Sequence, residues 1–220
     1  MKRVLFRFIL VMGLIIAAAP AYATTFYLDY TFSGDDPDGD PAWLTAELTD
    51  NPDPAGGVLL TLTTNLTGSE YVGSWYFNLN PDLNPTLLSF APQSGNPYAA
   101  GIVDTGVDAF KADGDGWFDI LFSFPTAEAD RFPGDGPVSI SWLITSTEEI
   151  TPDSFSFGST GHAEYFTAAH IQSILIPGGT TSGWIAGNAD PPTAAPIPGT
   201  AFLLGSGILS LVGWRRIRKS

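Results

Sequence analysis

The sequence predicts an all-β fold, an antiparallel β-sandwich of jelly-roll-like type, with a short apolar segment on either side of it. Short segments alternate apolar and polar residues with a period of two, as half-buried strands do. Stretches rich in Gly, Pro, Asp and Asn separate these segments, as turns would. Between the two ends, no window shows the apolar stripe of an amphipathic helix.

Residues 1–23 have the pattern of a secretory signal peptide. A positively charged start precedes an apolar run over residues 8–19, and small residues follow at the two positions that a signal peptidase reads. The basic residues are Lys2, Arg3 and Arg7, and the small ones are Ala21 and Ala23. We expect cleavage after Ala23, because a permanent membrane helix needs roughly 17 to 25 apolar residues.

Residues 24–185 are predicted to form the β-sandwich domain. The predicted inward stripes are Phe26, Leu28, Tyr30 and Phe32; Leu44, Ala46 and Leu48; Phe118, Ile120, Phe122 and Phe124; and Val138, Ile140, Trp142 and Ile144. Further predicted strands are 58–64, 71–79, 86–90, 155–157 and 170–176. The chain has no cysteine, so the domain must be stabilised by a packed core rather than by disulfides.

Two acidic loops are candidate calcium sites. Asp36, Asp38 and Asp40 stand at alternate positions, as carboxylates do in calcium loops, but the strand-like residues after them do not fit an EF-hand. Asp113 and Asp115 flank a glycine, and Asp-Gly is equally a strong signal for a hairpin turn. A calcium ion and a plain solvated turn therefore both remain open at each loop, and Ca²⁺ is the one cofactor that the sequence suggests.

Three tryptophans, Trp75, Trp117 and Trp184, are candidate sugar-stacking residues. Trp117 is out of phase with the apolar residues that follow it, which favours an exposed ring. Packing in the core is the alternative interpretation for each. No acidic pair stands in an apolar setting that would mark a glycosidase, and the spacing of the two histidines does not indicate a zinc site. We therefore predict no enzymatic activity.

The charges divide the chain into three parts. All 23 acidic residues lie between Asp29 and Asp190, where Lys111 and Arg131 are the only basic ones, so this part carries a net charge of −21. Such a surface repels phosphates, which argues against a nucleic-acid partner. Divalent cations and cationic partners are what it would attract.

A proline-rich linker, residues 186–195, is predicted to lead from the domain to the last segment, residues 196–220. This segment combines a proline step, an apolar run with three glycines and a basic cluster. The uncharged run would span ~21 to 27 Å as a helix, short against a bilayer core of ~30 Å. The basic cluster would stay on the cytoplasmic side. We expect a transient membrane anchor, with the proline step held extended for a protease.

This tail resembles the C-terminal sorting signal of exosortase-processed (PEP-CTERM) bacterial surface proteins. The matching elements are the proline motif Pro196, Ile197 and Pro198 with Gly199 after it, a Gly-Ser-Gly element at 205–207, and the cluster Arg215, Arg216, Arg218 and Lys219. Ile197 replaces the glutamate of the family motif, as in variant signals. The resemblance covers about 25 residues and implies a signal peptidase and an exosortase-like enzyme as partners.

Two other interpretations of the tail remain. Residues 197–201 are similar to a sortase pentapeptide, which would leave Thr200 as the new C-terminus, and the tail could also stay as a simple anchor. All three place the domain outside the cell, with the membrane contacted only through the C-terminal helix. We expect a non-enzymatic surface or extracellular-matrix protein with a structural or attachment role. The alternative is a secreted carbohydrate-binding domain, with extracellular polysaccharide as its partner.

Overall fold

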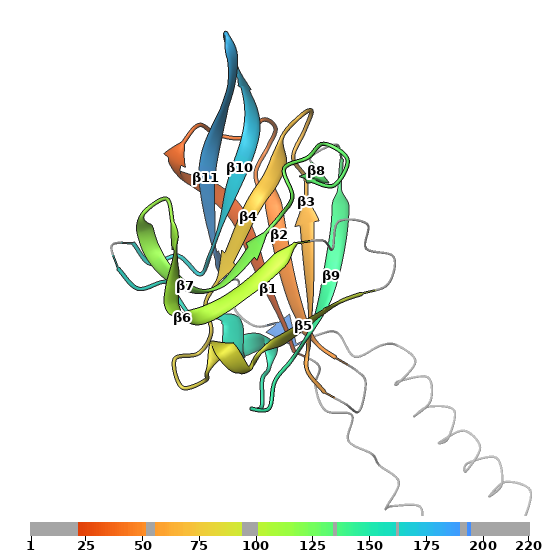
Figure 1. Cartoon of the computed structure of the whole chain (residues 1–220), viewed down its shortest axis with the longest axis vertical. Helices are drawn as coiled ribbons and strands as arrows, with labels where there is room; N and C mark the ends of the chain where they lie inside the picture. Colours follow the sequence, from red (N-terminus) through yellow and green to blue (C-terminus); the bar gives the residue numbers. More distant parts are fainter. Residues whose placement is uncertain are drawn as a thin grey trace, which may run out of the picture. The chain divides into compact units, whose positions relative to one another are not determined.

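The computed structural model describes residues 22–51, 56–93, 101–133, 136–161, 163–189 and 193–194, which form one antiparallel sheet of 12 strands (Figure 1). Its strands are β1 (Tyr22–Gly34), β2 (Leu44–Asp50), β3 (Val58–Thr64), β4 (Tyr71–Phe77), β5 (Ser89–Pro92), β6 (Ile102–Ala112), β7 (Asp115–Ser123), β8 (Phe132–Pro133), β9 (Val138–Thr145), β10 (Thr167–Ile176), β11 (Gly179–Ala189) and β12 (Thr193–Ala194). The short 3-10 helices η1 (Pro85–Leu87) and η2 (Pro152–Phe155) lie at the end opposite the tip of the β10–β11 hairpin. The prediction of an all-β, antiparallel fold is confirmed.

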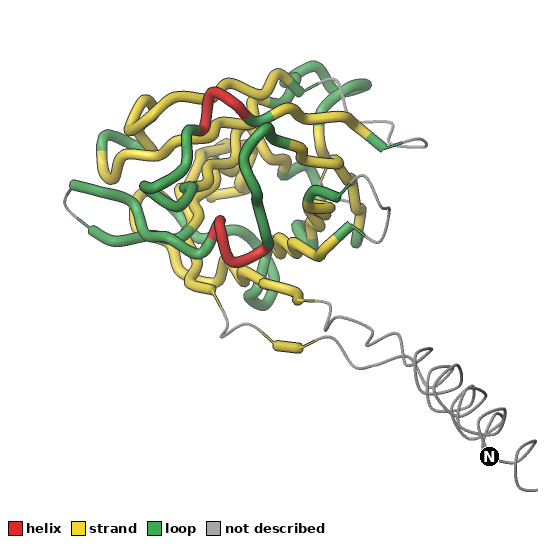
Figure 2. The backbone as a smooth tube through the Cα atoms, turned by 90° about the horizontal axis from the view of Figure 1, so that it is seen from below, coloured by secondary structure: helices red, strands yellow, loops and turns green. Residues whose placement is uncertain are grey.

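The sheet is rolled so that its two ends face each other. Hydrogen-bonded neighbours follow the order β5-β9-β3-β2-β1-β11-β10-β4-β7-β6, with β12 beside β1 and β8 beside β4. Phe122 on β7 lies near one end of this order, yet its ring centroid is 5.5 Å from that of Phe90 on β5 and 5.0 Å from that of Trp142 on β9. Figure 2 shows that the strands follow a curve rather than a flat layer. The two layers of the predicted sandwich are thus the two halves of one sheet.

The main core fills the inside of the roll. Strand β3 shows the expected pattern, because its residues alternate between buried and half-buried from Val58 to Thr64. The fully buried large side chains include Trp75, Trp142, Phe26, Phe77, Phe122 and Leu60. Their burial supplies the dominant favourable term in folding, as a domain without cysteines requires.

A second, smaller cluster packs on the outer face of the sheet. Its buried members are Tyr76, Ala112, Phe118 and Ala168, and Phe32, Phe110, Leu121, Tyr165 and Trp184 pack against them. Successive residues of a strand point to opposite faces, so Tyr76 lies outside while its neighbours Trp75 and Phe77 lie in the main core. We call this group the outer cluster.

Tyr30 and Phe32 do not continue the inward stripe that the sequence predicted for them. Phe26 and Leu28 are fully buried, but Tyr30 is 60% exposed and Phe32 belongs to the outer cluster. The pairing of β1 with β11 shifts register between Leu28 and Tyr30 and again between Thr31 and Ser33. Each shift inserts one extra residue, and an extra residue reverses the face that the following side chains occupy.

Four other predicted features differ from the structure. Phe118, predicted to face inward with Ile120 and Phe122, belongs to the outer cluster. Residues 155–157 were predicted as a strand, but Phe155 ends helix η2, and residues 86–90 form most of η1 and only the start of β5. Strands β6, β8, β11 and β12 were not predicted from the sequence. Strand β11 also runs to Ala189, so residues 186–189 of the predicted linker belong to the sheet.

The compact unit that these strands form extends from Tyr22 to Thr193. Within the residues that the structure describes, none of the helices has the length and apolar character that a membrane crossing needs. Apart from its last two residues, which begin β1, the predicted signal peptide lies outside the described residues, as does the whole predicted sorting signal.

Candidate functional site

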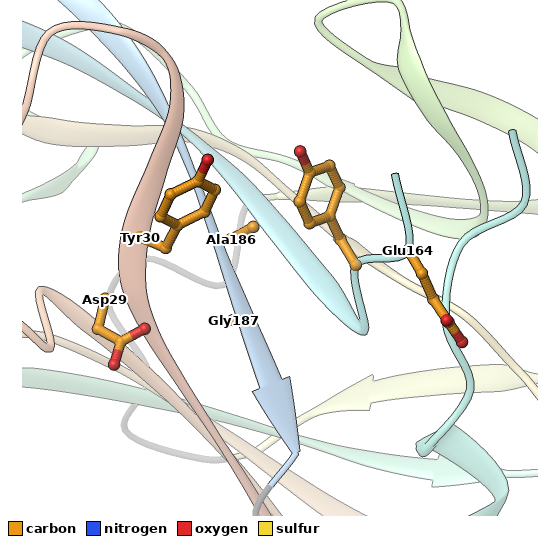
Figure 3. A pocket seen from close by; sticks show the side chains of 6 residues that line it. Asp29, Tyr30, Glu164, Ala186 and Gly187 are labelled. Carbon is orange, nitrogen blue, oxygen red and sulfur yellow. The ribbon is translucent and has the colours of Figure 1, made fainter. Parts of the chain in front are cut away.

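A cleft of about 300 Å³ opens on the outer face of the sheet, over strands β1 and β11 (Figure 3). Its lining residues are Asp29, Tyr30, Glu164, Tyr165, Ala186 and Gly187. Asp29 and Tyr30 lie to one side of Ala186 and Gly187, and Glu164 lies to the other (Figure 3). The volume is at the small end of the range of about 300 to 1,000 Å³ that small-molecule sites occupy.

The first β-bulge of β1 builds one wall of this cleft. Leu28 pairs with Gly187 and Tyr30 pairs with Ala186, so Asp29 is the extra residue between two successive partners. Both Asp29 and Tyr30 are exposed as a result, whereas regular alternation would have turned Tyr30 into the core. The bulge therefore places a carboxylate and an aromatic ring side by side at the surface.

The floor of the cleft is low because its residues are small. Ala186 pairs with Tyr30 on one side and with Ala168 of β10 on the other, and both alanines are buried. A Cβ atom added at Gly187 would meet the backbone carbonyl oxygen of Tyr27, so glycine is required for β1 and β11 to approach this closely. Because Ala186 has a one-carbon side chain and Gly187 has none, a hollow remains between the surrounding rings.

The loop before β10 supplies the opposite wall and is held firmly. The Ser159 hydroxyl donates to the carbonyl of Ala163 at 3.0 Å and accepts from the amide of Tyr165 at 3.0 Å, while the amide of Ser159 donates to the carbonyl of Tyr165 at 2.8 Å. The Tyr165 ring stacks on Phe32 with centroids 4.6 Å apart and an interplanar angle of 26°. The first bulge of β1 already turns the even positions outward, and Phe32, the extra residue of the second bulge, is the ring that holds Tyr165 in place.

Negative charge flanks the cleft on both sides. Within the described residues, no hydrogen bond or ion pair is found at the carboxylates of Asp29 and Glu164. Burial raises the pKa of Tyr165, and the nearby Asp115 and Tyr30 raise it further, so its hydroxyl stays protonated at neutral pH. The cleft therefore presents two tyrosine rings and two carboxylates that can accept hydrogen bonds from a ligand.

A stacked histidine and tryptophan continue the outer cluster beside the cleft. The rings of His170 and Trp184, which are paired residues on β10 and β11, lie 4.4 Å apart at an interplanar angle of 14°. Burial lowers the pKa of His170, and the charge of Asp113 partly opposes this effect. Because its pKa lies below 6.5, the imidazole of this stacked pair is neutral at pH 7.

The three tryptophans singled out by the sequence do not share one surface. Trp75 is fully buried in the main core, where its Nε1 donates to the Thr167 hydroxyl at 2.8 Å, so its ring has no face for a sugar. Trp184 is half-buried against His170. Trp117 is 38% exposed, but the Lys111 ammonium lies 4.2 Å from its ring centroid.

The first acidic loop is organised by a buried carboxylate. Asp36, Asp38 and Asp40 are exposed, and Glu70, which is 1% exposed, accepts a hydrogen bond from the amide of Asp38 at 2.8 Å and one from the amide of Thr67 at 3.3 Å. Burial raises the pKa of Glu70.

The second acidic loop is a two-residue hairpin turn. Asp113 and Gly114 have φ of 50° and 76°, the left-handed geometry of such a turn, and Asp115 pairs with Ala112. Across the described part of the chain, which includes both loops, no three His, Cys, Asp or Glu side chains gather closely enough to hold a metal ion.

The predicted processing sites lie mostly beyond the described residues. Ala23 is in β1, opposite Thr49 of β2, but Ala21 and the sorting-signal residues are not described. Those sorting-signal residues are Pro196, Ile197, Pro198, Gly199, Arg215, Arg216, Arg218 and Lys219.

Sequence reasoning missed all six residues that line the cleft. Tyr30 was assigned to the core, and no spacing in the sequence indicates that Tyr165 lies near it. Asp29 gave no signal of the bulge, because it stands at a polar position of the regular alternation between Leu28 and Tyr30. Comparison with protein-family models, with curated proteins and with solved structures found no match for this chain.

Proposed function

We propose that the protein is an exported cell-surface or extracellular-matrix protein, sorted by an exosortase-like enzyme, that acts in attachment or envelope architecture without catalysis. The observation that carries this proposal is the three-part order of residues 196–220: a proline step, an apolar run with a Gly-Ser-Gly element, and a basic cluster. The signal-peptide pattern of residues 1–23 supports it independently.

The domain suits a place outside the cell. It carries no cysteine, so its stability does not depend on the redox state of its surroundings. A jelly-roll-like sandwich, the architecture that the sequence predicts, would also leave its strand ends and outer face available for contacts. Its strongly acidic surface favours solubility and makes nucleic acid an unsuitable partner.

An intact mass of the protein recovered from the envelope and medium of its native host, with C-terminal peptide mapping, tests this proposal. We expect residues 1–23 and everything beyond about Pro198 to be absent. A product that ends at Thr200 would indicate a sortase instead. A product that retains Trp214 and the basic cluster would mean that the tail is a simple membrane anchor.

The cleft favours a second candidate function, a carbohydrate-binding domain. Aromatic rings at a hollow with polar acceptors are what a sugar needs, because its C–H face packs on a ring while its hydroxyls donate hydrogen bonds. Tyr30 and Tyr165 supply rings, and Asp29 and Glu164 supply acceptors. Retention of the protein on insoluble polysaccharides, compared with its Tyr30→Ala variant, is the first test of this function.

A further inference from the structure

The negative charge of the cleft limits the chemical class of ligand that it can bind. Asp29 and Glu164 flank it, and the two basic residues of the domain are engaged elsewhere. Lys111 lies over Trp117, and the Arg131 guanidinium carbon lies 4.8 Å from the ring centroid of Tyr71. Among the described residues, no cation therefore neutralises the carboxylates at the cleft. A ligand with positive charge would do so, and an anionic one would be repelled.

The cleft suits a saccharide better than an extended peptide, because it has no free strand edge. Extended peptides commonly bind by adding a strand to a free sheet edge. At this cleft no such edge exists, because β1 pairs with β2 and β11, and β11 pairs with β1 and β10. The cleft offers ring faces and side-chain acceptors over a low alanine floor, and a pyranose ring can use all of these.

The walls are also prepared in advance for a ligand. Tyr165 is fixed by its stacking on Phe32 and by the hydrogen bonds of Ser159, while the Tyr30 ring is 60% exposed and free to cover a sugar. One rigid wall lowers the ordering cost of binding. The second wall stands on an interior strand of the sheet, which keeps its backbone in place.

We propose that this cleft binds a saccharide that carries free amino groups, such as a deacetylated hexosamine polymer. The sugar ring packs against Tyr30 and Tyr165, and its ammonium groups approach Asp29 and Glu164. This inference rests on the carbohydrate-binding function proposed above and adds the chemical class of the sugar.

Calorimetric titration of the full-length protein in detergent tests the inference. The probes are β-1,4-linked glucosamine, N-acetylglucosamine and glucose oligomers of equal length. We expect the glucosamine oligomer to bind about 2- to 30-fold more tightly than the glucose oligomer, the advantage that two exposed ion pairs give. High salt should reduce this advantage, because it screens exposed charges.

Variants separate the two parts of the site. Asp29→Asn and Glu164→Gln should abolish the preference for the amino sugar while binding of the glucose oligomer persists. Tyr30→Ala should weaken binding of every oligomer by about tenfold, since it removes a ring face. Matched controls are Glu149→Gln, an exposed carboxylate elsewhere, and Tyr27→Ala, an exposed ring on the same strand that does not line the cleft.

Three other outcomes of these titrations would each overturn the inference in a different way. Equal affinity for all three oligomers, unaffected by the carboxamide variants, would refute the amino-sugar preference and leave carbohydrate binding intact. Binding of a lysine- and arginine-rich peptide but of no oligomer would show that the ligand is a cationic protein segment. Binding of none of the probes would refute both this inference and the carbohydrate-binding function, while processing of the tail would be unaffected.

Discussion

Glu70 is a carboxylate buried beneath the loop 36–40, which makes the stability of this region depend on pH. Burial raises its pKa above the ordinary 4.5, and the two amide hydrogen bonds it accepts only partly offset this. Because the folded state holds the proton more tightly than the unfolded state, its contribution to stability is fully present below about pH 4.5. That contribution is lost as the pH rises through the folded-state pKa.

Glu70→Gln should remove this pH dependence. We expect the difference between the free energies of unfolding of the parent protein and the variant to shift in favour of the parent when the pH is lowered from 7 to 4.5. Urea denaturation of both proteins at the two pH values measures it, and other titrating groups cancel in the difference. A difference between the two proteins that is constant across this range would contradict the buried, proton-retaining state of Glu70.

His170 behaves in the opposite sense. Its pKa lies below the ordinary 6.5 because of burial, so its contribution to stability is present above about pH 6.5 and is lost as the pH falls through the folded-state value. Asp113→Asn should lower this pKa further, since the charge of Asp113 is what opposes the effect of burial. Asparagine tolerates the positive φ of the turn, so the hairpin should remain intact.

A proton NMR titration of the His170 imidazole measures this shift. The matched control is Asp82→Asn, which neutralises an exposed carboxylate elsewhere in the chain and should leave the midpoint unchanged. An upward shift in Asp113→Asn, or equal shifts in both variants, would mean that Asp113 does not act on His170 through its charge.

At the scale of elements, two glycines illustrate different requirements of the strands. Gly114 has φ of +76° and open space around it, so Gly114→Ala should cost only backbone strain, about 1 to 2 kcal/mol. At Gly187 an added methyl would collide with the backbone of Tyr27, so Gly187→Ala should cost about 3 kcal/mol by forcing β1 and β11 apart. Urea denaturation compares the two variants, and equal losses would contradict the tight approach of these strands.

Strands with a clean alternation could be predicted from the sequence, and strands built around glycine could not. Residues 58–64 were predicted with the bounds that the structure shows, because each second side chain faces the main core. Strand β11 carries Gly179, Gly183 and Gly187, and glycine is a poor strand former. The close approach of Tyr27 on β1 requires a glycine at position 187, but pairing between distant strands leaves no local signal in the sequence.

The cleft escaped prediction for the same reason. A β-bulge is defined by the pairing of two strands, so nothing within residues 26–32 shows that Tyr30 turns outward. The hairpin turn at Asp113 and Gly114, by contrast, was one of the two interpretations of that loop, because its geometry is local.

At the scale of the whole molecule, Phe122 links the two ends of the rolled sheet. It is fully buried, and its ring contacts those of Phe77 on β4, Phe90 on β5 and Trp142 on β9. Phe122→Ala should therefore lower the free energy of unfolding by about 3 to 5 kcal/mol. Leu121→Ala, at the half-buried neighbouring position on the outer face, should cost clearly less.

Chemical denaturation with tryptophan fluorescence measures both variants. Trp142 contacts Phe122, so it is one of the tryptophans whose emission changes when the roll opens. Equal losses in the two variants would mean that the ends of the sheet are not coupled through Phe122.

The placement of the two basic side chains of the domain has a consequence for its persistence. Trypsin-like proteases cut after lysine or arginine, and between Asp29 and Asp190 the chain offers only Lys111 and Arg131. Both are laid over aromatic rings, on Trp117 and Tyr71, and leaving the ring would cost each of them a cation–π contact. A domain with so few lysines and arginines would resist trypsin-like proteases, and even complete cleavage by them would leave it in a few long fragments.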